Sequence, residues 1–213
     1  DNYLLLDQIQ GSLEETSILY RASRALNDAS TPSEILNVII SYLTNRPVSH
    51  GFIALLSTES WENPKAAAQV VATWQRDSDF GINLTGMTLV PGQYPAWRFL
   101  ASSAVLTVDD ISTADNLDAM ERIGIESLEL RSMSVLPLRI AGRAIGAMVF
   151  GARASYRHTE RDLRIYRSLA EQASLRLEAA RLLAQTERRA RQLTTSAEVS
   201  QIASSILDLS ILL

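Results

Sequence analysis

The sequence predicts an α+β fold, in which helices cover a six-stranded, largely antiparallel sheet. Two observations lead to this prediction. Short apolar segments bounded by turn-forming residues recur between residues 52 and 150, and amphipathic helical patterns precede and follow them. With 213 residues, of which 46% are hydrophobic, the chain can bury one core of ordinary size and still supply long helices.

The first expected element is an amphipathic helix over about residues 3–27. Along it, mainly apolar residues recur at steps of three and four, which is the spacing of a helical face that packs against a partner. The pattern starts almost at residue 1, so we expect this helix to belong to a longer one. Its seam predicts one half of a dimer interface, formed by Leu6, Ile9, Leu13 and Tyr20.

A second helix is predicted to start at Thr31. This threonine suits the N-cap, Pro32 suits the first helical position, and Glu34 completes a capping box. The helix then presents a broad apolar face and ends near residues 45–47.

Short apolar runs next predict four strands, at residues 52–56, 69–74, 87–90 and 105–108. A short helix is expected over residues 94–102. The acidic segment 109–131 follows, where Asp115 or Asn116 is expected to cap a helix that runs through Arg122 and ends at Gly124.

A β-hairpin closes the sheet, with strands at residues 132–138 and 144–150 around the turn Ala141-Gly142. Thr159, with Asp162 three residues later, is then expected to cap a long helix. Leucine, tyrosine and alanine residues recur along this helix at the spacing of a coiled coil. The second half of the predicted dimer interface lies there, at Tyr166, Ala173, Leu177 and Ala180.

The closing half of the domain resembles a GAF domain, through Pro137-Leu138, Gly142, Ile145-Gly146 and the run 159–163. The resemblance covers roughly residues 20–185.

It implies a regulatory module that binds a small molecule and transmits the signal through paired helices, with segment 109–131 as a lid. It also implies a ligand site bordered by Trp74, Tyr94, Trp97 and Arg98, with Met133, Ser134 and Met148 as further lining. The aromatic walls and the cationic Arg98 suit an anionic or aromatic ligand. The alternative is that both tryptophans belong to the core.

The composition excludes several classes of function. There is no cysteine, so thiol catalysis, cysteine metal sites and the covalent bilin attachment of phytochrome-like GAF domains are excluded. His50 and His158 have no ligand partners at metal-binding spacing, and no residue pattern predicts a catalytic site. A net charge of −4 argues against nucleic acid, and no apolar run is long enough to cross a membrane. We expect a cytoplasmic protein.

Three functions remain open from the sequence. The first is a sensor domain that binds an unknown small molecule, works as a homodimer and passes its signal to neighbouring signalling domains. The second is a structural relay without a ligand, and the third is a cysteine-independent hydrolase. The predicted organisation is a signalling helix at 1–30, a GAF-like core at 31–158 and a connecting helix at 159–195. Residues 196–213 would then begin a second such domain, because the sequence around Ala22–Leu36 has an echo at 199–213.

Overall fold

A computed structural model of the chain describes residues 16–43, 46–57, 60–63, 65–76, 83–94 and 97–211, with side chains up to Gln192. The predicted interface residues Leu6, Ile9 and Leu13 lie outside the described residues. The chain divides into two units, Asp1–Leu177 and Glu178–Leu213, which are described separately below.

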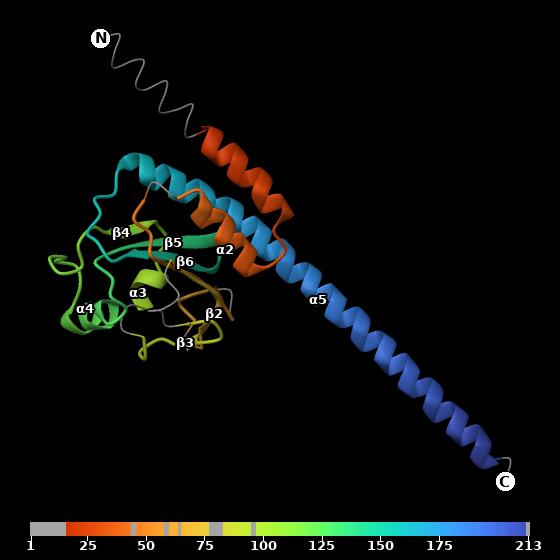
Figure 1. The fold of residues 1–213 in the computed structure, drawn as a ribbon. Coiled ribbons are helices and arrows are strands. Elements are labelled where there is room, and N and C mark those ends of the chain that lie inside the picture. Colours follow the sequence, from red (N-terminus) through yellow and green to blue (C-terminus); the bar gives the residue numbers. More distant parts are fainter. Residues whose placement is uncertain are drawn as a thin grey trace. The chain divides into compact units, whose positions relative to one another are not determined.

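Six strands form one antiparallel sheet in the order β3-β2-β1-β6-β5-β4 (Figure 1). This confirms the predicted sheet, with each strand within a few residues of its expected position. Most sequential strands are neighbours, whereas the pairing of β1 with β6 joins segments that are far apart in the chain. The strands are β1 (His50–Leu56), β2 (Ala68–Gln75), β3 (Thr88–Leu89), β4 (Leu106–Val108), β5 (Ser132–Ile140) and β6 (Arg143–Ala152).

The turn between β5 and β6 lies where the sequence places it. Ala141 has φ 48° and Gly142 has φ 78°, so both turn residues are left-handed. Two consecutive left-handed residues match the right-handed twist of the flanking strands, which is why such turns are preferred in tight hairpins.

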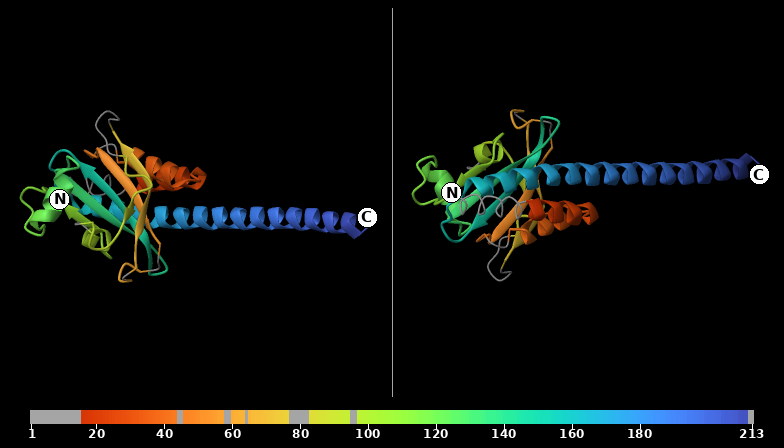
Figure 2. Two further views of the ribbon diagram at one scale, coloured as in Figure 1. Left: turned by 90° about the horizontal axis from the view of Figure 1, so that it is seen from below. Right: turned by 90° about the horizontal axis from the view of Figure 1, so that it is seen from above.

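Helices cover one face of the sheet, which we call the helix face (Figures 1 and 2). They are the helix of residues 16–28, α2 (Pro32–Ser41) and the part of α5 (Glu160–Ile211) up to Leu177. The predicted capping box of α2 is confirmed, since the Thr31 hydroxyl accepts the N–H of Glu34 and the Glu34 carboxylate accepts the N–H of Thr31. Arg176 joins α5 to the end of the first helix by donating to the carbonyl oxygens of Asn27 and Ala29.

The seam expected on α5 is buried by its own chain. Tyr166, Ala173 and Leu177 are 1%, 0% and 2% exposed and belong to the core between the helices and the sheet. Their assignment to a dimer interface is therefore wrong, because periodicity shows that a helix has a partner but not whether that partner is the same chain. Tyr20, in contrast, is 68% exposed, and its place in an interface stays a prediction.

Loops and two short helices cover the opposite face, which we call the loop face (Figure 2). These helices are α3 (Trp97–Leu100) and α4 (Ala119–Glu126). α4 begins later than expected, since Asp118 is its N-cap in place of Asp115 or Asn116, and Gly124 lies inside it. The cause is a capping box that Asp118 forms with Glu121, which satisfies two backbone donors at once.

The second unit consists mainly of the remainder of α5 from Glu178. From Arg181 to Gln192 every residue is exposed, and Arg181 pairs with Glu178 at 2.7 Å. Ala180 is half-buried, and the boundaries predicted at residues 195 and 196 stay predictions. In the described part of the chain, no helix is both long and apolar enough to cross a membrane.

Candidate ligand site

A cavity of about 260 Å³ lies on the loop face, and we call it the sheet cavity. Its floor consists of the neighbouring strands β2, β1 and β6, and its walls come from Leu84 and from residues 127–130, the lid segment. The lining residues are His50, Gly51, Phe52, Thr73, Trp74, Gln75, Leu84, Ser127, Leu128, Glu129, Leu130, Val149 and Gly151.

The floor of the cavity has an apolar row and a polar row. Phe52 on β1 lies between Thr73 on β2 and Val149 on β6, which are its partners in the two ladders. Two residues along, His50 is the partner of Gln75. Apolar area therefore lies beside groups that both donate and accept hydrogen bonds, the combination typical of small-molecule sites.

The lid segment is held by its backbone and by one close contact with the sheet. Glu129 has a left-handed φ of 58°, and its N–H donates to the carbonyl oxygen of Glu126 at 2.8 Å, which turns the chain out of α4. Leu130 then lies against Gly151, where any Cβ would come within 2.6 Å of the leucine methyl carbons. Gly151 thus allows the lid to approach the floor.

The charged side chain at the cavity is already paired. The Glu129 carboxylate lies 3.4 Å from Nε of Arg153, and 62% of the Glu129 side chain is exposed. Glu129 is the only charged residue among the described residues that line the cavity.

Trp74 borders the sheet cavity, as the sequence predicts, but strand alternation places its ring on the other face. In the ladder it is the partner of Gly51, and a Cβ at Gly51 would meet Ile40 of α2. The ring of Trp74 accordingly packs against the core of the helix face. An apolar run does not show which face each residue occupies, so the sequence did not reveal this.

Tyr94, Trp97 and Arg98 do not line the sheet cavity. Tyr94 packs in the core of the loop face, where burial raises the pKa of its hydroxyl to about 12. Trp97 packs edge-on against Trp61, with ring centroids 5.0 Å apart. The guanidinium of Arg98 forms a 2.5 Å ion pair with Glu121 of α4. The cationic group that was expected at the ligand site therefore holds α4 in place.

The three further predicted lining residues are core residues. Met148 is fully buried on the helix face, and Met133 is buried on the loop face. Ser134 is 2% exposed and does not line the sheet cavity. The residues that the sequence did not single out, above all Phe52, Thr73, Gln75 and Leu130, became neighbours through strand pairing that no local pattern shows.

Ser134 instead belongs to a polar group at the start of α5. Its Oγ lies 2.7 Å from Nε2 of His158, and Nδ1 of His158 lies 2.7 Å from Oδ1 of Asp109. A serine, a histidine and an aspartate in this order form the constellation that activates serine nucleophiles. The adjoining void is only about 10 Å³, so no acyl substrate could reach the serine. The arrangement is therefore a structural network.

A buried ion pair adjoins this network. Nη2 of Arg46 lies 2.5 Å from Oδ1 of Asp162, while Oδ2 of Asp162 accepts from Thr159 and from the Tyr156 hydroxyl. Burial acts to raise the pKa of Asp162, but the hydrogen bonds from Thr159 and the Arg46 charge outweigh it, so the pKa is lowered. Together we call these groups the α5 cluster: Arg46, Asp109, Ser134, Tyr156, Thr159, His158 and Asp162.

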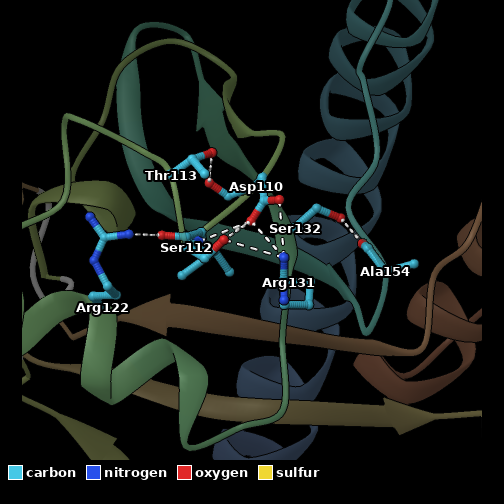
Figure 3. A network of polar contacts seen from close by, with 8 residues as sticks. Asp110, Ser112, Thr113, Arg122, Arg131, Ser132 and Ala154 are labelled. Carbon is cyan, nitrogen blue, oxygen red and sulfur yellow. Dashed lines mark hydrogen bonds and ion pairs between the residues drawn. The ribbon is translucent and has the colours of Figure 1, made fainter.

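Asp110, Ser112 and Arg131, which we call the base of the lid, are hydrogen-bonded to one another and to the chain that leads into α5 (Figure 3). The carboxylate of Asp110 accepts from Arg131 and Ser112, which lowers its pKa, with the Ser112 hydroxyl as the largest cause. The N–H of Arg131 donates to the carbonyl oxygen of Ala152, and the Ser132 hydroxyl donates to that of Ala154. Arg131, directly after the lid segment, is thus hydrogen-bonded both to Asp110 and to the end of β6, and Ser132 is bonded to the connection that leads from β6 to α5.

A second cavity, of about 330 Å³, lies beside α5 and β5. Its lining includes the charged side chains of Arg139, Arg167 and Glu171 and no aromatic residue, so it differs from the sheet cavity in charge and in having no aromatic ring. Among the described residues, no group of three or more histidines and carboxylates could hold a metal ion.

The comparisons with known proteins agree with this fold. A GAF domain family model matches residues 29–178, so the chain belongs to the GAF domain family. Members of this family are generally sensory and not catalytic. No curated protein sequence matches the chain.

Three solved structures illustrate the likeness, which at this sequence identity concerns the fold alone. The chromophore-binding domain of the bacteriophytochrome RpBphP3 from R. palustris is 12% identical, with a TM-score of 0.64 over 81% of this chain and 63% of that chain. The GAF domain of a phosphoenolpyruvate-protein phosphotransferase from Acinetobacter is 13% identical, with a TM-score of 0.61 over 81% and 98%. A phycoerythrobilin-bound GAF domain from a cyanobacterial phytochrome is 14% identical, with a TM-score of 0.59 over 80% and 97%.

Proposed function

We propose that this chain is a regulatory GAF sensor domain that binds a small molecule, without covalent attachment, in the sheet cavity. The observation that carries the proposal is the cavity itself, which combines an apolar floor, a row of hydrogen-bonding groups and a closing segment. Binding there would bias the position of the lid segment, because Leu128 and Leu130 form part of the wall.

One of the solved GAF domains described above is bound to a bilin, phycoerythrobilin. Since these 213 residues include no cysteine, they supply no thiol for a thioether bond to a ligand, and we propose that the ligand is held by non-covalent contacts. The affinity then depends on how well the cavity fits the ligand, and a poorly fitting molecule leaves again.

The route from the lid to α5 supports a signalling role. Asp109 lies at the start of the loop that leads to α4, and His158 directly precedes α5. The carboxylate of Asp109 accepts the backbone N–H of His158 and also lies beside Nδ1 of its ring. The carbonyl oxygen of Asp109 also accepts the N–H of Tyr156. A displaced lid would therefore pull on the α5 cluster, and α5 would carry the change to neighbouring signalling domains.

We further propose that the domain works as a homodimer in the cytoplasm. Exposed apolar side chains support this on each unit taken separately: Tyr20 and Leu175 in the first, and Leu182 and Leu183 in the second. Each is at least 49% exposed and would be covered by a partner that packs on it.

The alternative is a structural relay domain without a ligand. One observation favours it, since about 260 Å³ lies just below the ~300 Å³ at which pockets for drug-sized ligands begin. Both functions share the fold and the α5 cluster, and they differ in whether the cavity is filled by a molecule.

Native mass spectrometry of the purified chain separates the two functions and counts the subunits. The sensor proposal predicts a retained molecule that is absent from a Thr73→Phe variant, because the added ring fills the cavity. Gln69→Phe is the matched control, since Gln69 is exposed on the same strand outside the cavity. Wild-type protein that neither retains a molecule nor acquires one from a cell extract would support the relay.

A further inference from the structure

The volume of the sheet cavity limits the size of its ligand. An apolar protein cavity of about 150 Å³ holds one benzene molecule, so a cavity of about 260 Å³ holds about ten non-hydrogen atoms. That corresponds to two fused rings. A bilin has four rings and two acidic side chains, so the cavity as it stands is several times too small for it.

The shape of the cavity favours a flat molecule. Its floor is the pleated surface of three adjacent strands, on which Thr73, Phe52 and Val149 lie in one row. Its roof includes Leu130, which the missing side chain of Gly151 brings close to that floor. An aromatic ring fits such a slot and can pack against Phe52.

The charges around the cavity favour a neutral molecule. No arginine or lysine is among the described residues that line it, and the carboxylate of Glu129 already lies beside Arg153. A phosphate or carboxylate placed there would lose its water without gaining a cation, which costs several kcal/mol for each buried ion. Nδ1 of His50 lies 2.9 Å from the Ser49 hydroxyl, whereas Nε2 of His50 and the amide of Gln75 are groups of the kind that hydrogen-bond a polar edge.

We propose that the ligand is a neutral, planar, bicyclic nitrogen heteroaromatic molecule, with its polar edge toward His50 and Gln75 and its rings over Phe52. This inference rests on the proposed function and names the chemical class that the sheet cavity accepts. The sequence suggested an anionic or aromatic ligand; this inference keeps the aromatic class and drops the anionic one, because Arg98 is engaged with Glu121 and does not line the cavity.

The test compares five probes by isothermal titration calorimetry on the purified chain: indole, its carbocyclic isostere indene, hypoxanthine, AMP and biliverdin. We expect indole or hypoxanthine to bind one molecule per chain with a Kd of about 100 µM or tighter, given their size. Indene should bind about fivefold more weakly than indole, because it has no ring N–H to donate. AMP and biliverdin should not bind.

Two variants place the binding in the sheet cavity. Thr73→Phe should weaken indole or hypoxanthine binding by about tenfold or more, whereas Gln69→Phe should change it by less than about twofold. Gln75→Leu, which keeps the strand but removes the amide, should weaken the better heteroaromatic probe by about fivefold. Circular dichroism confirms that each variant is folded before it is titrated.

The outcomes separate the inference from the proposed function. If AMP or biliverdin binds in a Thr73-dependent way and the bicyclic probes do not, the chemical class is wrong but the sensor function stands. Equal binding of indole and indene overturns the polar edge. If no probe binds and native mass spectrometry finds no retained molecule, both the inference and the sensor function are overturned.

Discussion

The two faces of the sheet are packed by different means. On the helix face, three helices pack aliphatic side chains against the sheet, and Ile35, Ile39, Ile53, Leu136 and Met148 have no exposed surface, while a cavity of about 330 Å³ lined partly by charged side chains lies beside α5 and β5. On the loop face, short helices and connecting segments cover a comparable core but leave a cavity of about 260 Å³.

The difference follows from the covering elements. A long helix presents a continuous row of side chains at regular spacing, so it can pack closely against the sheet residues beneath it. A loop must satisfy its own backbone polar groups, so its path is set by hydrogen bonds such as those of Glu129 and Arg131. We infer that the helix face provides stability and the loop face provides room for a ligand.

The largest effect is expected from removing equal side chains on the two faces. Leu136→Ala leaves a new void inside the filled helix face and should cost about 3–4 kcal/mol. Leu130→Ala, on a residue that already borders the sheet cavity, should cost about 1–2 kcal/mol because part of its surroundings is empty. Urea unfolding followed by circular dichroism measures both. Equal losses would mean that the loop face is as well filled as the helix face.

The next effect concerns the ion pair buried in the α5 cluster. Asp162→Asn leaves Arg46 without its counter-charge and should cost about 3 kcal/mol at pH 7. The folded pKa of Asp162 is lowered, so its contribution is complete above the unfolded pKa of about 4 and is lost as the pH falls through the folded pKa. The difference in free energy of unfolding between wild type and variant should therefore be smaller at pH 3 than at pH 7. A difference that persists unchanged at pH 3 would exclude the carboxylate charge as its cause.

A pair of glycines gives a smaller and more direct comparison. A Cβ at Gly51 would lie 3.0 Å from Ile40 Cδ1 on the helix face, and one at Gly151 would lie 2.6 Å from the Leu130 methyl carbons on the loop face. Gly51→Ala should cost about 1–2 kcal/mol, because Ile40 has no free space to enter. Gly151→Ala should cost less than about 1 kcal/mol, because Leu130 can move into the cavity and reduce its volume. Thermal unfolding ranks the two, and the opposite ranking would contradict the comparison.

The smallest effect is expected at the exposed base of the lid. Arg131→Gln removes the ion pair with Asp110. The side chains of Arg131 and Asp110 are 50% and 27% exposed, so the substitution should lower the free energy of unfolding by about 0.5 kcal/mol. Because the pair is exposed to solvent, 0.5 M salt should remove most of this difference. A loss of stability that is large and insensitive to salt would show that the base of the lid contributes as much to stability as the helix face does.

Local patterns in the sequence were enough for the elements of the fold. Thr31 and Glu34 form the expected capping box, Gly142 lies in the expected turn, and Thr159 caps α5 with Asp162 as expected. These features depend on residues within a few positions of one another. Helix caps and hairpin turns obey strong local rules, so such elements can be read from one sequence.

The candidate site depended on contacts that local patterns do not contain. Trp74 was expected in the cavity wall, but the ladder places it opposite Gly51 on the helix face. No local pattern indicates that Arg46 meets Asp162 or that Ser134 meets His158. The β1–β6 ladder brings together the segments of Arg46 and Asp162, and the β5–β6 ladder brings together those of Ser134 and His158; register between strands is set by the whole core.

The order of the strands also has a consequence for how the domain folds. The β1–β2 and β5–β6 pairs are local, whereas the ladder between β1 and β6 must close a long stretch of chain and pays the larger loop entropy. The floor of the sheet cavity spans this late seam, with His50 and Phe52 on one side and Val149 and Gly151 on the other. A ligand can therefore bind only after the two halves of the sheet have joined, and by mass action it would slow unfolding of the finished domain without assisting the earlier steps.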